Sequence, residues 1–228
     1  MTTLRTFTLF TLLLAATGAF ALDQEGGVRF LVGDPVGDFG DNVDDNGYGL
    51  ALHYGVRPQR SVTLGVGLHG MTYGSESTTY RLPLVDEFDL TTTNNLAGGF
   101  LFAQWRPLDG FVQPYAEGRV GINYLWTESK LEDDGWWNDD EVARKTNQDD
   151  FATFWTAGGG LLIRLSEGNR AEKRPGVFLD LKATYQHGGN AEYLTEGAIT
   201  LVDDEPVFAT SESTTELTTY ELGVVLTF

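Results

Sequence analysis

Apolar and polar side chains alternate with a period of two along most of the chain after residue 21. The alternation is clearest at the end, where one parity is apolar and aromatic and the other is polar or small: the apolar positions are Tyr220, Leu222, Val224, Leu226 and Phe228. Alternation of this kind predicts β-strands with one apolar and one polar face. Eight such segments are expected, with the bounds Val28–Asp34, Gly47–Arg57, Ser61–Tyr73, Thr92–Arg106, Phe111–Thr127, Phe151–Leu165, Gly176–His187 and Glu216–Phe228.

Two of the expected strands are less well defined than the rest. The first is short, and we expect it to extend through Val36 towards Phe39. The fourth has an ambiguous parity because residues 100–103, Phe-Leu-Phe-Ala, are all apolar. Most of the other segments reach the roughly 9–11 residues that a tilted strand needs to cross a bilayer.

The connections between these segments alternate in length and in charge. Those after the second, fourth and sixth segments are short and basic, with Arg57, Arg60, Arg106, Arg170, Lys173 and Arg174 in or beside them. Those after the first, third, fifth and seventh are long and acidic. Short turns at one rim and long loops at the other are typical of outer-membrane barrels.

Composition and charge exclude several classes of protein. The formal net charge is −18, which is the wrong sign for a general nucleic-acid binder. There is no cysteine, so disulfides, zinc–thiolate sites and thiol nucleophiles are all excluded. The acidity indicates either solvated loops, as in a salty habitat, or loops that bind a divalent cation.

The first 21 residues have the form of an export signal. They contain one basic residue, Arg5, an apolar stretch from Phe7 to Ala16, and a small-x-small ending at Ala19-Phe20-Ala21. The apolar stretch is shorter than the roughly 20 residues of a spanning helix. We therefore expect a signal peptide over residues 1–21 and one mature domain over residues 22–228.

A barrel with one apolar face can turn that face inward, as in a soluble lipocalin-like barrel, or outward to lipid. Small residues crowd the polar face, as expected inside a narrow barrel, and aromatic residues lie near the segment ends, as in a membrane aromatic belt. The outward orientation is favoured.

Parity then places seven charged residues inside: Arg29, Glu117, Arg119, Arg164, Asp180, Lys182 and Glu221. We expect a salt-bridged network that fills the lumen, because buried charges must be paired; a gated narrow pore is the alternative. His53 and His69 are expected beside it as lumen-filling groups.

The whole pattern resembles the OmpA- and OmpX-like class of outer-membrane β-barrels over nearly all of residues 28–228. This resemblance implies an all-β, eight-stranded, antiparallel, up-and-down transmembrane barrel with short periplasmic turns and long acidic extracellular loops. It also implies outer-membrane lipid as the surroundings and the barrel assembly machinery as a partner during biogenesis. The assembly signal would be the last strand, with Phe228 as its terminal aromatic residue and Tyr220, Leu222, Val224 and Leu226 on the same face.

The resemblance fixes location and fold but leaves the role of the barrel open. A structural or surface-interaction role with a closed lumen is expected; the alternatives are a narrow channel and a lipid-modifying enzyme. No catalytic, cofactor-binding or metal-binding residue is assigned. A hydrolase would place His187 near the outer rim, but the sequence offers no neighbouring serine. Recognition is expected in the long loops, where adjacent Trp136 and Trp137 form either a stacking platform for a surface ligand or a cluster that packs on its own rim.

Overall fold

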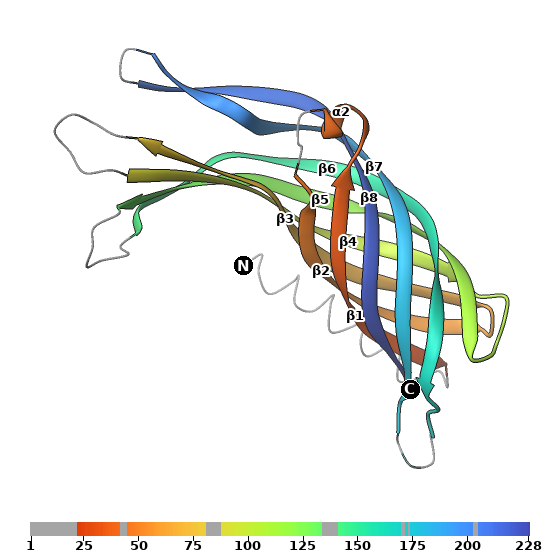
Figure 1. The fold of residues 1–228 in the computed structure, drawn as a ribbon. Helices are drawn as coiled ribbons and strands as arrows, with labels where there is room; N and C mark the ends of the chain where they lie inside the picture. Colours follow the sequence, from red (N-terminus) through yellow and green to blue (C-terminus); the bar gives the residue numbers. More distant parts are fainter. Residues whose placement is uncertain are drawn as a thin grey trace, which may run out of the picture.

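The computed structural model describes residues 22–41, 45–80, 88–133, 141–169, 172, 174–202 and 205–228. All eight expected strands are present, and they form one closed antiparallel barrel in which β8 pairs with β1 (Figure 1). The strands are β1 (Asp23–Pro35), β2 (Gly47–Gln59), β3 (Val62–Tyr80), β4 (Phe88–Trp105), β5 (Val112–Asp133), β6 (Glu141–Ser166), β7 (Gly176–Val202) and β8 (Glu205–Thr227). The expected up-and-down topology is confirmed, since each strand pairs with its neighbours in the sequence. In the described part of the chain, no helix is long and apolar enough to cross a membrane.

The first strand differs from the sequence interpretation at both ends. It begins at Asp23 rather than Val28, and it does not continue towards Phe39. Residues Gly37–Gly40 instead form the short helix α2, entered through Gly37 at a positive φ of 61°. Phe39 of this helix is fully buried and packs edge-on against Tyr73, with ring centroids 5.4 Å apart. The helix therefore places an aromatic ring over one end of the barrel interior.

Several connections expected as long loops are in large part strand. The pairing of β3 with β4 continues to Tyr80↔Phe88, that of β4 with β5 to Phe88↔Asp133, and that of β5 with β6 to Glu132↔Glu141. Strands β3–β6 thus extend beyond the closed part of the barrel as a four-stranded sheet. Strands β7 and β8 extend separately as a two-stranded ribbon that is paired as far as Val202↔Glu205 (Figure 1).

Register shifts mark the level at which these extensions leave the barrel. They lie at Tyr73/Ser75 between β3 and β4, at Thr127/Glu128 between β5 and β6, and at His187/Asn190 between β7 and β8. An extra residue in one strand of a pair bends that strand and increases its twist. The extensions accordingly curve away from the barrel on the side of α2, opposite the C-terminus (Figure 1).

The two faces of the strands are placed as the outward orientation predicts. On β2, Leu50 and Leu52 have exposed fractions of 58% and 55%, whereas Ala51 between them is buried. The same holds for β4, whose parity the sequence left ambiguous. There Leu101 faces outward, and Phe100 and Phe102 are buried inside.

Candidate functional site

The barrel interior gathers six of the seven charged residues that parity predicts there. They are called the lumen network below, and all of them are buried: Arg29, Glu117, Arg119, Asp180, Lys182 and Glu221. They come from β1, β5, β7 and β8, and successive members of one strand lie two residues apart, which keeps them on the same face. Three are cationic and three anionic, so the network is formally neutral.

Two glutamates hold the centre of the network together. Glu117 accepts from Arg119 Nε at 2.7 Å, from Lys182 Nζ at 2.8 Å and from the side-chain amide of Gln104 at 3.1 Å. Glu221 accepts from Arg119 Nη2 at 2.8 and 3.0 Å, and its Oε2 lies 2.9 Å from Lys182 Nζ. Arg119 and Lys182 therefore bridge the two carboxylates, so that no charge at the centre is left without a counter-charge.

Arg29 joins the third carboxylate to this centre. Its Nε lies 2.5 Å from Asp180 Oδ2 and 3.8 Å from Glu221 Oε2. Asp180 also accepts a hydrogen bond of 2.6 Å from the Tyr115 hydroxyl, and Arg29 Nη1 lies 2.8 Å from His53 Nδ1. His53 is thus one of the groups that fill the lumen, as expected. Tyr115 was not anticipated, since the sequence interpretation placed it in a strand but assigned it to neither face.

An aromatic layer lies next to the charges. The guanidinium carbon of Arg119 is 4.7 Å from the centroid of the Phe100 ring, within the range of a cation–π contact. His69 stacks on the same ring with a centroid distance of 5.6 Å and lies 5.4 Å from the Phe154 ring. Its Nε2 is 2.8 Å from Asn123 Oδ1. His53 and His69 are therefore satisfied by other partners, and no group of three potential metal ligands occurs in the part of the chain that the structure describes.

Apolar residues occupy the interior on either side of the charged centre. Towards α2, one buried cluster comprises Phe39, Tyr73, Leu96, Leu125, Ala152 and Leu217. Towards the short turns, a second comprises Tyr115, Leu162, Phe178 and Val225. The cavity between the charged centre and the α2 cluster measures about 20 Å³, room for roughly one water molecule. Thr156 and Gln186 line this cavity with side-chain polar atoms that no protein group satisfies.

The seventh predicted member of the lumen network lies elsewhere, and the sequence missed a separate buried ion pair. Arg164 has the inward parity, but it lies near the end of β6 at the short-turn rim and pairs there with exposed Glu167 at 3.1 Å. Arg106, expected among the rim charges, is buried instead with an exposed fraction of 2%. Its Nη2 donates to both oxygens of Glu25 at 3.0 and 3.1 Å, and Arg57 donates to the same carboxylate at 3.0 Å. The early start of β1 is what places Glu25 inside the barrel.

The outer surface carries aromatic clusters near the level where the extensions begin. Tyr124 lies 5.3 Å from Trp126 and 4.8 Å from Phe151, measured between ring centroids. The Tyr124 hydroxyl donates to Asp149 at 3.3 Å, and the Trp126 indole donates to Glu128 at 3.2 Å. Both acceptors lie on the extension side of the rings, so the polar atoms of this cluster point away from the apolar middle of the barrel wall.

Other candidate residues are placed as follows. The five last-strand residues from Tyr220 to Phe228 that form the expected assembly signal all lie on the exposed outer face. His187 Nδ1 lies 2.8 Å from Glu216 Oε1, and its ring is 5.7 Å from that of Trp155. Trp136 and Trp137, like the expected signal peptide over residues 1–21, lie outside the described residues.

No protein-family model and no curated protein sequence matches this chain. Among solved structures, the chain is similar to a major outer-membrane protein of Thermus thermophilus, with 12% identity and a TM-score of 0.46 over 92% of this chain and all of that one. It is also similar to Ail of Yersinia pestis, solved with the heparin analogue sucrose octasulfate: 14% identity, TM-score 0.40, over 92% of this chain and all of that one. A third is Neisserial surface protein A, with 11% identity and a TM-score of 0.40 over 90% of this chain and 95% of that one.

Proposed function

We propose that this chain is an outer-membrane β-barrel with a closed lumen and a structural or surface-interaction role, exported by residues 1–21. The observation that carries the proposal is the reversed distribution of side chains. The outer face is apolar on every strand, and the interior holds paired charges. In water this arrangement would expose a broad apolar belt, whereas in a bilayer it is the expected one.

The size of the apolar belt supports a membrane setting. On β8 it runs from Tyr220 to Phe228, a length of about 27 Å along the strand at the usual rise. At a tilt of about 40° this corresponds to about 20 Å along the barrel axis, close to the apolar band of about 25 Å that such barrels present to lipid. The aromatic clusters, whose polar atoms point towards the strand extensions, are expected at the edge of that band, where it meets water.

The closed interior favours a structural role over a channel. The lumen network and the apolar cluster below α2 leave a cavity for about one water between them, which is too small for a solute to pass. We assign any recognition of a surface ligand or divalent cation to the strand extensions and their connections, including Trp136 and Trp137. Loops and hairpins on a rigid scaffold commonly carry such functions.

Conductance in reconstituted bilayers tests the closed lumen. We expect the wild-type barrel to give no steady ion current and Glu117→Ala to raise the current. The substitution removes one of the two acceptors that Arg119 and Lys182 share and leaves a space in its place. Ile122→Ala, an outward-facing change on the same strand, is the matched control and is expected to behave as wild type. A steady wild-type current would favour the channel alternative. A Glu117→Ala current equal to that of the control would show that the lumen network is not the plug.

A further inference from the structure

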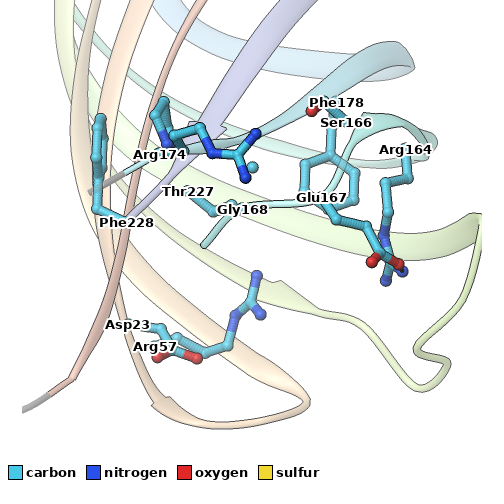
Figure 2. Close-up of a pocket in the computed structure, with 12 residues that line it drawn as sticks. Asp23, Arg57, Arg164, Ser166, Glu167, Gly168, Arg174, Phe178, Thr227 and Phe228 are labelled. Atoms are coloured by element: carbon cyan, nitrogen blue, oxygen red, sulfur yellow. Dashed lines mark hydrogen bonds and ion pairs between the residues drawn. The ribbon is translucent and has the colours of Figure 1, made fainter. Parts of the chain in front are cut away.

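The short-turn end of the barrel contains a cavity of about 670 Å³ on its inner side (Figure 2). It is lined by the start of β1, the ends of β2, β6 and β8, the start of β7 and the connection between β6 and β7. Its size falls within the usual range for sites that bind small molecules. None of the proposed roles of the lumen network uses this cavity.

Three arginines from different elements line the cavity: Arg57 from β2, Arg164 from β6, and Arg174 from the connection before β7. Asp23 and Glu167 are the acidic side chains in its lining, and Glu25 and Glu172 pair with Arg57 and Arg174 from beside it. Three guanidinium groups at one cavity are notable in a chain whose net charge is −18. An anion in the cavity would therefore lie among three guanidinium groups.

The main chain at Arg174 and an aromatic ring beside Arg164 restrict the positions of these two arginines. The β6–β7 connection is closed by a backbone pair between Asn169 and Arg174, with N···O distances of 2.8 and 2.9 Å in its two directions. It is so tight at Gly168 that a Cβ atom there would come 2.6 Å from the backbone nitrogen of Gly176. The guanidinium carbon of Arg164 lies 5.8 Å from the centroid of the Phe178 ring, which limits the orientations of that group.

The existing partners of Arg164 and Arg174 leave donors for a ligand, whereas Arg57 is paired with the buried carboxylate of Glu25. Arg164 contacts Glu167 through Nη1, and Arg174 contacts Glu172 through Nη2. Both carboxylates are well exposed, with side-chain exposures of 80% and 57%, so the pairs are of the weak surface kind that a better anion can replace. A guanidinium has five N–H donors in a planar fork, which matches the oxygens of a phosphate group.

We propose that this cavity is a binding site for a phosphate-bearing molecule, with Arg164 and Arg174 as the main contacts to the phosphate and Arg57 beside them. The apolar part of the same molecule lies against Phe178, whose ring forms part of the wall (Figure 2). The phosphate comes either from a small soluble ester on the short-turn side of the membrane or from a phospholipid headgroup. The site stands on its own geometry and does not require the lumen to be closed.

Binding to the full-length mature barrel in a non-ionic detergent tests the site. Glycerol 3-phosphate serves as the soluble probe, followed by calorimetry, and phosphatidylglycerol as the lipid probe, followed by native mass spectrometry with phosphatidylcholine as reference. We expect saturable binding of one probe, weakened by added salt. The double substitution Arg164→Gln with Arg174→Gln is expected to weaken it by about a hundredfold, since each lost charge-assisted contact contributes about tenfold.

The control is Arg60→Gln, which removes the same charge from an exposed position at the same end of the barrel that does not line the cavity. It is expected to leave binding within about twofold of wild type, because rim charge alone contributes little. Binding of glycerol 3-phosphate identifies the soluble source, and selective retention of phosphatidylglycerol identifies the lipid. The proposal is overturned if neither probe binds saturably, or if Arg60→Gln weakens binding as much as the double substitution does.

Discussion

Glu221→Ala is expected to lower the free energy of unfolding by about 3–5 kcal/mol, as breaking a buried ion pair by removing one partner typically does. Glu221 accepts two hydrogen bonds from Arg119 and lies within ion-pair distance of Lys182 and Arg29. Without it, three buried cations share the two remaining carboxylates of the lumen network, and one positive charge is left uncompensated in a medium of low polarity. Urea unfolding of the barrel in lipid vesicles, followed by tryptophan fluorescence, measures the change.

Two further variants separate charge from packing at this position. Glu221→Gln keeps the shape of the side chain but removes its charge, so we expect most of the destabilisation to remain. Thr218→Ala changes an outward-facing side chain on the same strand and is expected to alter stability by no more than about 0.5 kcal/mol. A Glu221→Ala barrel as stable as the Thr218→Ala barrel would mean that the lumen network contributes nothing to holding the interior together.

Leu52→Arg is expected to cost about 2–4 kcal/mol, because it places a charge on the lipid face near the middle of the membrane. Leu52 lies midway along the outward face of β2, between Tyr48 and Val56, with an exposed fraction of 55%. In water the same substitution at an exposed position would cost almost nothing. The same vesicle unfolding assay measures it, and the yield of folded barrel provides a second measure.

The position of the charge along the barrel wall is the control for this prediction. Gln24→Arg places the same charge on the outward face at the short-turn end, where arginine costs only about 0–1 kcal/mol in a lipid-facing barrel. Equal stability of the Leu52→Arg and Gln24→Arg variants would contradict the placement of the apolar face in lipid.

The sequence predicted the features that depend on side-chain parity. Polar and apolar side chains must alternate along a barrel strand that has polar contacts on one face and an apolar environment on the other. Six of the seven charged residues that this rule assigns to the interior are buried there. Arg164 faces inward as parity predicts, but it does not join the lumen network because it lies near the end of β6. There the barrel opens to water, and Arg164 pairs with the exposed Glu167 three residues later.

The features that the sequence did not predict lack an alternating signal. The extensions of β3–β8 are rich in Ser, Thr and Glu, and a strand whose two faces are both polar has no hydrophobic period to detect. The early part of β1 was missed because Gly26 and Gly27 interrupt its pattern. The His53 ring packs directly against the backbone at Gly27, where a side chain would clash with it. The need for glycine at this position therefore comes from a residue on the neighbouring strand.

The incorrect start of β1 also concealed the Glu25 ion pair. With β1 beginning at Val28, Glu25 would lie in a linker, and Arg57 and Arg106 would be free to act as rim charges. With β1 beginning at Asp23, the same carboxylate lies inside and accepts from both arginines. Burial that depends on contacts between residues of different strands cannot be predicted from the sequence of one strand alone.

The most direct test of the account is to isolate outer membranes from cells that express the intact gene and to compare boiled with unboiled samples on a denaturing gel. In the closed part of the barrel every strand is paired on both sides, so this part has no edge from which a detergent can begin to unfold it. We predict that the protein is in the outer-membrane fraction and that its band changes position on boiling. A soluble periplasmic protein that needs no detergent and shows no such change would contradict the account, and would mean that the apolar face lines the interior.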